Sequence, residues 1–296
     1  GSYKVSVILK TLAAEYWQYV KSGAEDYASE HSDKVTVEVK GPSSETAFDE
    51  MQNMIETDLS SGSYDGVIIS PLQSDTAAQL VSGTKLPIVA IDTNFTAPEV
   101  KSFVGTGNEA AAKKGGEAAV EAAKAAGWTD IKCIEIAGVQ GDQTNTARMN
   151  GYKAGVEEAG GTFLSDEVQY ADATADRATT AMEAIMQTHP EGIAIICANN
   201  DDMAMAAARA AKGNAAYEKT IFVGFDGIQS ACNAILSGEE TMSVAQEAYD
   251  MGYKAVEAAV KAVNGETLEK FIDSGCSVVT KDNAQERLDK LKGYIG

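Results

Sequence analysis

Hydrogen-bonding side chains recur directly after apolar, strand-like stretches of this sequence. Asp92 follows the apolar run at 88–91, and Asp226 ends a second run of the same kind. Asn200 and Gln246 follow two further runs. Carboxylates accept hydrogen bonds from hydroxyl groups, whereas amides both donate and accept them. The spacing therefore predicts polar side chains at the carboxyl ends of buried strands, which is where ligands bind in open α/β sheets.

Charged donors and aromatic rings complete this set of side chains. Arg148 and Lys10 supply charged donors, and Tyr16, Trp17 and Phe225 supply apolar faces. Sugars need this combination, because their hydroxyls bond to carboxylate and guanidinium groups while their C–H faces pack on rings. A handful of charge-assisted hydrogen bonds is enough for micromolar binding, about −8 kcal/mol. The sequence therefore predicts a site for a polar, uncharged ligand.

Each of these residues also has a structural explanation. Asp226 precedes a glycine and is typical of a turn or a helix cap, Trp17 suits a core, and Arg148 suits an exposed helix face. Carboxylate-only catalysis by Asp92 and Asp226 stays open as well. The joint occurrence of these residues at strand ends favours a binding function.

Strand and helix patterns alternate in the first part of the chain. One helix should place Tyr16, Tyr19, Val20, Ala24 and Tyr27 on a single face. Alternation of this kind predicts a parallel sheet with right-handed crossovers. The strands are expected at 4–9, 35–39, 67–69, 88–91 and 102–104, and further helices at 45–59, from 74, and up to 126.

The alternation restarts after residue 126 and predicts a second α/β lobe of similar size. Strands are expected at 131–136, 163–170, 193–197, 221–224, 242–245 and 271–280, and helices around 148, at 174–187, from 201, from 228, at 247–263 and at 283–291. The first change of lobe is expected near Thr106. The short strands of the tail indicate that the chain crosses between lobes more than once, through a multi-strand hinge rather than a flexible linker.

Composition excludes some classes of partner. The 296 residues carry a formal net charge of −20, which disfavours nucleic acid and anionic membranes as partners. No apolar run is long enough to span a bilayer. Gly1-Ser2 resembles a remnant of tag removal, which is consistent with a leader peptide that has been removed.

Cysteine and histidine give no sign of a metal or redox site. The four cysteines form no CxxC, and Cys133 and Cys197 are expected to be small buried side chains in strands. His31 and His189 lie near predicted helix ends and are expected to be solvated. Neither a disulfide framework nor a metal site is therefore predicted.

Two further classes of motif are weak or missing. The segment 105–110 (GTGNEA) matches GxGxxA, but it follows a short strand and lacks the acidic residue that a dinucleotide site needs after the next strand. A chain crossover that needs glycine flexibility is the favoured interpretation. The sequence contains no GxSxG, HExxH or P-loop motif.

Six short stretches together resemble the type I periplasmic sugar-binding proteins of the ribose/allose/galactose-binding group. They are spread over nearly the whole chain and read VILKTLAAEYW, IDTN, TARMNGY, CANNDDMAM, VGFDGI and SVAQ. The resemblance implies an α/β fold with two Rossmann-like lobes, each built on a parallel sheet and joined by a three-crossing hinge. The lobes would comprise 1–106 plus 247–275 and 107–246 plus 276–296.

The same resemblance implies a function and a site. The chain would be a monomeric solute-binding protein of an ABC transporter, which closes around a monosaccharide or related polyol and hands it to the permease. It implies neither enzyme activity nor a cofactor, and the calcium loop of galactose-type relatives is not apparent. The implied ligand-binding residues are Lys10, Glu15, Tyr16, Trp17, Asp92, Asp142, Arg148, Asn200, Phe225, Asp226 and Gln246, with Ser70, Thr106 and Tyr170 as weaker contacts.

The chain departs from the family pattern at two places. Ala14 stands where relatives carry asparagine, and the expectation is either that Glu15 replaces the lost contact or that the ligand lacks the group that asparagine would bind. The stretch 172–177 lacks the aromatic residue that precedes an Asp-Arg pair in relatives, and the expectation is either that this aromatic wall is missing or that Tyr170 substitutes for it. Both departures concern which sugar is bound.

Two other functions fit the same architecture. A LacI-type sugar-responsive regulator would carry a helix-turn-helix ahead of the first strand, and this sequence opens directly on a strand. A sugar-modifying enzyme would convert its bound sugar into a product, whereas a binding protein would only bind it. For the binding protein, the expected location is periplasmic or extracellular, with a lipid anchor at the cell surface as one form.

Overall fold

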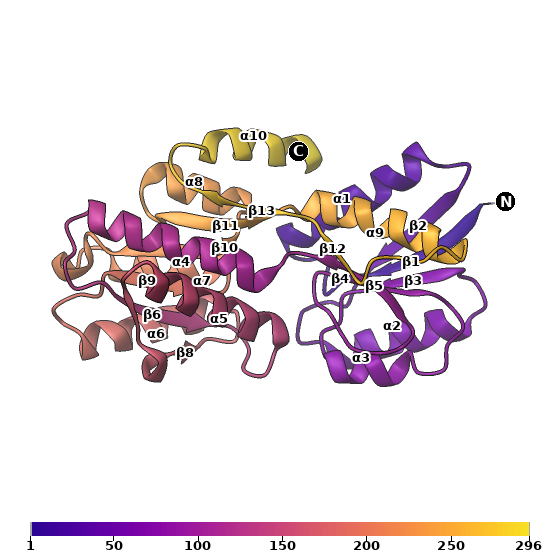
Figure 1. Cartoon of the computed structure of the whole chain (residues 1–296), viewed down its shortest axis with the longest axis horizontal. Helices are drawn as coiled ribbons and strands as arrows, with labels where there is room; N and C mark the ends of the chain where they lie inside the picture. The colour runs from indigo at the N-terminus through magenta and orange to yellow at the C-terminus, as the bar shows by residue number, and fades with distance from the viewer. Residues whose placement is uncertain (1, 296) are drawn as a thin grey trace. The chain divides into compact units, whose positions relative to one another are not determined.

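The computed structural model describes residues 2–295 and divides into two compact units. Unit 1 comprises Gly1–Thr106, Glu247–Gly275 and Tyr294–Gly296, and unit 2 comprises Gly107–Gln246 and Cys276–Gly293. Each unit is an α/β assembly around its own sheet (Figure 1). Tyr294, expected in the second lobe, belongs to unit 1 because its ring stacks 4.1 Å from that of Tyr249.

The sheet of unit 1 has six strands in the order β12-β5-β4-β3-β1-β2. Every neighbouring pair is parallel. β3 and β4 are buried along their whole length, as expected for parallel strands covered on both faces. The strands are β1 (Tyr3–Ile8), β2 (Val35–Lys40), β3 (Gly66–Ile69), β4 (Ile88–Ile91), β5 (Val100–Gly105) and β12 (Phe271–Asp273).

Helices cover both faces of this sheet, with α1 and α9 on one face and α2 and α3 on the other (Figure 1). They are α1 (Glu15–Glu30), α2 (Phe48–Ser60), α3 (Ser74–Leu80) and α9 (Ala248–Val263). The expected stripe from Tyr16 to Tyr27 is buried in α1. α1 and α9 touch through glycines, because a Cβ on Gly23 or Gly252 would strike the backbone of the other helix.

The sheet of unit 2 has the order β13-β11-β10-β9-β6-β7, with β8 also paired to β6. The expected parallel sheet is confirmed for the other described pairs, and β13 alone among them runs antiparallel, to β11, where the chain returns to this sheet after the turn at 274–275. The strands are β6 (Lys132–Ala137), β7 (Thr162–Phe163), β8 (Gln169–Tyr170), β9 (Ile195–Ala198), β10 (Ile221–Asp226), β11 (Met242–Gln246) and β13 (Cys276–Val279).

Two hydrophobic cores lie on the two faces of this second sheet. Cys133 of β6 packs with α4 and α5, whereas Ile134 packs with α6 and α7, because successive strand residues point to opposite faces. The helices are α4 (Asn108–Ala125), α5 (Gln143–Glu158), α6 (Ala175–Thr188), α7 (Asp201–Ala211), α8 (Gln229–Ser237) and α10 (Ala284–Ile295), with short 3-10 turns η1 (Ser165–Glu167) and η2 (Ala215–Tyr217).

Three of the expected strands differ from the structure. The segment 163–170 is split, because β7 and β8 pair with different parts of β6 and η1 lies between them. The segment 271–280 is also split, because Gly275 turns the chain at a φ of 89° and sends β12 and β13 to different sheets. β5 has six residues rather than three.

The segment 105–110 is the first of the chain's passages between the units. The expectation that its glycines supply unusual backbone angles is wrong, since Gly107 has an ordinary φ of −69° and caps α4. At Gly105 the constraint is space, because a Cβ there would strike the Phe103 ring.

Cys133 and Cys197 are buried as expected, with their sulfurs 3.3 Å apart and both thiols free. The expectation of a solvated His189 is wrong. Its side chain is 15% exposed, and its ring bonds to Glu167 at 2.5 Å and to Glu191 at 3.1 Å.

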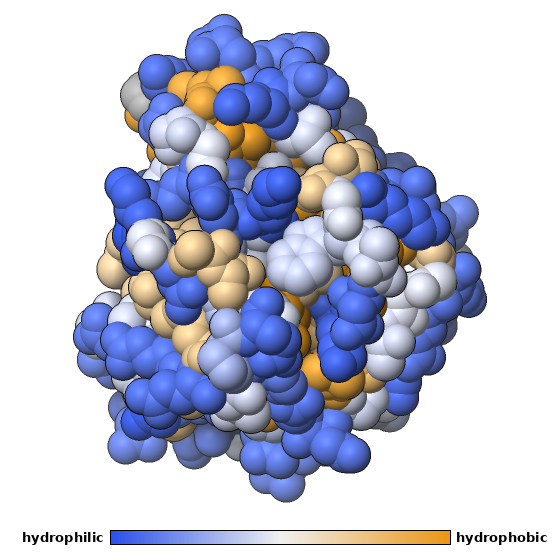
Figure 2. Space-filling view, turned by 90° about the vertical axis from the view of Figure 1, so that its left-hand side faces the viewer, coloured by the Kyte–Doolittle hydropathy of each residue, from blue (hydrophilic) through white to orange (hydrophobic). Residues whose placement is uncertain are grey.

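No helix within residues 2–295 is both long enough and apolar enough to cross a bilayer. In the same range, His, Cys, Asp and Glu side chains do not gather in threes around a metal-sized position. The face drawn in Figure 2 is covered mostly by hydrophilic side chains, with hydrophobic ones scattered among them.

Candidate functional site

The predicted site residues fall into two groups, one at the carboxyl ends of the strands of each unit. We call Lys10, Glu15, Tyr16, Trp17, Ser70, Asp92 and Thr106 half-site 1, and Asp142, Arg148, Tyr170, Asn200, Phe225, Asp226 and Gln246 half-site 2. This placement follows from parallel pairing, which brings successive strand ends to the same edge of a sheet.

Asp92 is the centre of half-site 1. It directly follows β4, is 4% exposed, and accepts a hydrogen bond of 2.7 Å from the Tyr16 hydroxyl and one of 3.0 Å from Thr93. Its backbone φ of 65° lies in the left-handed region, which aspartate tolerates better than most residues. The carboxylate is therefore held by its neighbours in a fixed direction at the strand end.

The aromatic part of half-site 1 comes from the first turn of α1. Trp17 is 4% exposed and meets the Tyr16 ring edge to face, with ring centres 5.0 Å apart. Glu15 accepts a hydrogen bond from Tyr19 one turn further along the helix. Trp17 therefore packs largely into the core of unit 1, as its structural interpretation also predicted.

Lys10, Ser70 and Thr106 lie at three other strand ends of unit 1. Lys10 is half-buried and makes no hydrogen bond or ion pair to any residue in 2–295. The Ser70 hydroxyl oxygen is sealed from solvent and has no hydrogen-bond partner within the same residues. Thr106 is 2% exposed. Lys10 thus offers half-site 1 a charged donor that the fold itself does not use.

Arg148 and Phe225 form the wall of half-site 2. The guanidinium carbon lies 3.9 Å from the centre of the Phe225 ring, within the range of a cation–π contact. Arg148 donates from Nε to Asn108 at 3.0 Å and from Nη1 to the Asn199 carbonyl at 2.7 Å. Both residues are buried, and the arginine is held on three sides.

Asp226 ends β10 beside this wall. Its Oδ1 accepts a hydrogen bond of 2.8 Å from Gln246 and lies 3.9 Å from Nη2 of Arg148. Its φ of 115° is unusual for a residue with a side chain. Nη2 makes no hydrogen bond within residues 2–295. An N–H donor and a carboxylate acceptor therefore stand side by side, too far apart to bond to each other directly.

Asn200, Asp142 and Tyr170 are less clearly placed for a ligand. The Asn200 side chain caps α7 by accepting from the Met203 N–H, and it donates to the Ala173 carbonyl. Asp142 caps α5 by accepting from the Thr144 N–H. Tyr170 is 39% exposed on β8, and its side chain makes no hydrogen bond within residues 2–295. Asn200 and Asp142 therefore have structural roles that their sequence position alone did not reveal.

Several supporting residues were not predicted. Asn108 and Asn199 hold Arg148, and Thr93 holds Asp92. Arg287 of α10 donates to the backbone carbonyls of Gly227 and Gln246 at 2.7 and 2.9 Å. Asn199 could have been found as the residue before Asn200, but nothing in the sequence connects Arg287 with a loop sixty residues earlier.

Tyr152 supports the carboxyl-terminal parts of β9 and β10. Its hydroxyl donates to the Ala198 carbonyl at 2.9 Å and lies 3.2 Å from that of Gly224. Complete burial raises the pKa of Tyr152 well above its usual value, so the hydroxyl keeps its proton. Half-site 2 thus combines fixed donors, fixed acceptors and a stacked cation, which suits recognition of hydroxyl groups.

Comparison with known proteins gives matches over most of the chain. Residues 5–267 match the family described as "Periplasmic binding protein domain". The D-allose-binding periplasmic protein of Escherichia coli is 30% identical over 267 residues, which covers 87% of this chain and 83% of that protein. The ribose import binding protein RbsB of Bacillus subtilis is 27% identical, covering 94% and 88%.

Solved structures agree with this fold. An ABC transporter solute-binding protein from Agrobacterium vitis with bound D-fucose is 25% identical and superposes with a TM-score of 0.83, covering 97% of this chain and 99% of that one. A carbohydrate transporter solute-binding protein from Agrobacterium radiobacter in complex with D-arabinose reaches a TM-score of 0.86 at 24% identity, over 100% and 99%. The match of one family over most of the sequence and the agreement in fold lead to one conclusion: the chain belongs to the periplasmic binding protein family.

Proposed function

We propose that this protein is the solute-binding protein of an ABC importer and that it captures a monosaccharide or related polyol without transforming it. The observation that carries the proposal is the pairing of Arg148 Nη2 with Asp226 Oδ1 at 3.9 Å beside the Phe225 ring. A sugar hydroxyl placed between the two groups accepts from the arginine and donates to the aspartate, while a C–H face of the sugar meets an apolar side chain.

Relatives support the class of ligand. D-allose, ribose and D-fucose occur in the names of the related proteins described above. All are polyhydroxylated and uncharged, which agrees with a site built from carboxylates, amides and one stacked arginine. The family consists of binding proteins, and on this basis we propose that Asp92 and Asp226 serve as acceptors rather than as a catalytic pair.

A thermal-shift screen followed by calorimetry tests the proposal. D-allose, D-ribose, D-fucose, D-arabinose and myo-inositol would be added separately to the purified chain. A sugar at 100 times its dissociation constant adds about 2.7 kcal/mol of apparent stability. One stereoselective shift with 1:1 binding and no turnover of the sugar is the expected result.

A matched pair of variants identifies the site in the same screen. Asp226→Ala should weaken binding at least tenfold, because the arginine would then face the ligand without its acceptor partner. Asp166→Ala removes the same charge from an exposed position of η1 and should bind normally. A flat response of the parent chain to every sugar would contradict the proposed function.

We further propose that the two half-sites act on one ligand and that the units close around it. The chain passes between the units several times, which suits a hinge rather than a flexible tether. Ligand contacts made by both units would stabilise the closed population. Small-angle X-ray scattering with and without the bound sugar should show a smaller radius of gyration in its presence, and an unchanged radius would contradict closure.

The remaining parts of the proposal concern partner and location. We propose that the sugar-loaded protein docks as a monomer on the permease of its importer, and that it works in the periplasm or, lipid-anchored, at the cell surface. Light scattering should give the mass of a single 31.0 kDa chain.

A further inference from the structure

Two acidic side chains are buried directly beneath the Asp226 turn. Asp201 is the first residue of α7 and is 0% exposed, and Glu240 precedes β11 and is 1% exposed. Asp201 Oδ1 and Glu240 Oε2 both lie next to the point that a Cβ on Gly224 would occupy. The two carboxyl groups are therefore neighbours, and the missing side chain of Gly224 leaves the space for them.

Neither acid forms an ion pair with any residue that the structure describes. Within residues 2–295, Asp201 Oδ1 and both Glu240 oxygens are sealed from solvent and receive no hydrogen bond from any third residue. Two buried carboxyl groups whose oxygens meet at one point do not both carry a charge, so they share a proton. Burial and the neighbouring acid raise the pKa of Glu240 well above its usual value, and burial raises that of Asp201 to about 6. At neutral pH, Glu240 is therefore the protonated member of the pair.

The second oxygen of Asp201 holds the turn that follows Asp226. Oδ2 accepts from the Gly227 N–H at 2.7 Å and from the Ile228 N–H at 3.3 Å. These are the two peptide groups next after the residue with a φ of 115°. A carboxylate that binds both N–H groups fixes the chain direction at this point and opposes relaxation of the strained residue.

We infer that Asp201 and Glu240 are a positioning pair, which holds the Gly227–Ile228 turn and thereby aims the Asp226 carboxylate at the ligand. The inference rests on the proposed function for its ligand. Glu240 donates its proton to Asp201 Oδ1, which leaves Oδ2 as a charged acceptor for the turn. The pair meets half-site 2 at the backbone next to Asp226, and Asp201 also directly follows Asn200 in the chain.

Variants of Glu240 separate positioning from simple stability. Glu240→Gln keeps a donor for Asp201 at every pH, whereas Glu240→Leu leaves Asp201 Oδ1 buried without one. Glu239→Gln is the matched control, because Glu239 is the adjacent acid and pairs with Arg209 at 2.9 Å instead. Far-UV circular dichroism and urea unfolding would establish that each variant is folded under the assay conditions.

The first readout needs no ligand. Amide hydrogen exchange of Gly227 and Ile228, followed by NMR, should be slow in the parent chain, in Glu240→Gln and in Glu239→Gln. It should be at least tenfold faster in Glu240→Leu, while the Met203 amide, which bonds to Asn200 Oδ1, stays unchanged as an internal reference. Exchange at parent rates in a folded Glu240→Leu variant would overturn the inference, whether or not any sugar binds.

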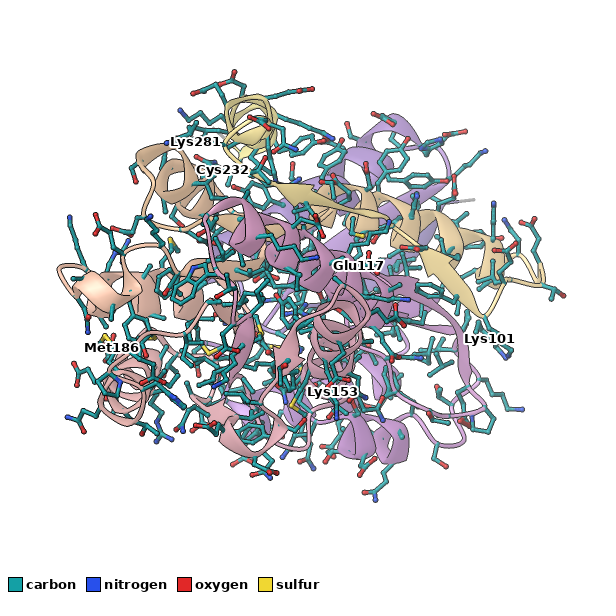
Figure 3. The ribbon with its side chains drawn as sticks, turned by 60° about the vertical axis from the view of Figure 1, so that its left-hand side comes forward. Lys101, Glu117, Lys153, Met186, Cys232 and Lys281 are labelled. Atoms are coloured by element: carbon teal, nitrogen blue, oxygen red, sulfur yellow. The ribbon has the colours of Figure 1, made fainter. Side chains whose placement is uncertain are left out.

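The second readout is the affinity for D-allose between pH 7 and pH 9, above the pKa of about 6 of Asp201. The parent chain should lose affinity as pH rises and Glu240 ionises against Asp201, and Glu240→Gln should bind equally well throughout. Asp202 on α7 and Cys232 on α8 (labelled in Figure 3) also face Glu240, and both remain in every variant. Faster exchange without a loss of affinity in Glu240→Leu would show that the turn does not position Asp226. Absence of D-allose binding in the parent chain would count against the ligand and leave the exchange result intact.

Discussion

The central carbon of the Arg148 guanidinium group lies over the Phe225 ring, 3.9 Å from the ring centre. Asn108 and the Asn199 carbonyl hold the same group at Nε and Nη1. The arginine is thus fixed before any ligand arrives, and a preorganised donor loses little entropy on binding. This relationship predicts that lysine is a poor substitute at position 148.

Replacing Arg148 with lysine should therefore weaken sugar binding at least tenfold. The ammonium group retains the charge but loses the planar fork and the stacking on Phe225. Calorimetric titration measures the loss. Arg209→Lys changes an exposed arginine of α7 and should leave affinity unaltered. Equal affinity of the two variants would remove Arg148 from the site.

Removing the Tyr16 hydroxyl should loosen Asp92. Tyr16→Phe deletes the 2.7 Å hydrogen bond to the carboxylate and leaves the partner oxygen buried. The expected loss of stability is about 1 kcal/mol, with a several-fold loss of affinity. Tyr253→Phe, which deletes a hydroxyl bond to Glu30 at the surface of unit 1, should leave affinity unchanged. Stability is read from urea unfolding and affinity from calorimetry.

Unit 2 should lose stability as pH rises above about 6.5 because of His189. Its hydrogen bonds to Glu167 and Glu191 raise the pKa of the imidazole above 6.5. A raised histidine pKa gives stability that is complete below the unfolded value of about 6.5 and disappears as pH rises through the folded value.

The urea midpoint at pH 6 and pH 8.5 measures this contribution. His189→Gln should remove the part of the pH dependence that comes from this cluster, and His31→Gln is the matched change at the other histidine. An identical pH dependence in His189→Gln and the parent chain would contradict the assignment.

The contact between α1 and α9 can be tested with one methyl group. Gly252→Ala would drive a Cβ into the Val20 carbonyl, and overpacking of this kind typically costs about 1–3 kcal/mol. Gly293→Ala places the same methyl in open space on α10 and should stabilise by about 0.5–1 kcal/mol through helix propensity. Opposite shifts of the urea midpoint are expected, and a neutral Gly252→Ala would show that the helices lie further apart.

The fold could be predicted from the sequence because its signals are local. Apolar runs ending in a polar residue marked the strands, and the stripe from Tyr16 to Tyr27 marked the buried face of α1. Pairing direction is not local. Nothing in 276–279 distinguishes an antiparallel edge strand from a parallel one, and that choice depends on where the chain returns after Gly275.

The candidate site was predictable in part for the same reason. Strand-end residues such as Asp92 and Asp226 could be chosen from their position, and their roles in binding stay predictions. The residues that hold them come from distant parts of the chain. Arg287 and Glu240 have no motif of their own, and only three-dimensional proximity connects them with the turn after Asp226.

The two units are interleaved along the chain, and this affects the order in which they can fold during synthesis. Unit 1 receives α9 and its edge strand β12 from residues 248–273, long after the first 106 residues have been synthesised. Until then α1 lies on its face of the sheet without its partner α9, and the nascent N-terminal segment is incomplete as a folding unit. Unit 1 therefore cannot complete its fold until late in synthesis. A fragment that stops at Gln246 should not fold into two stable units.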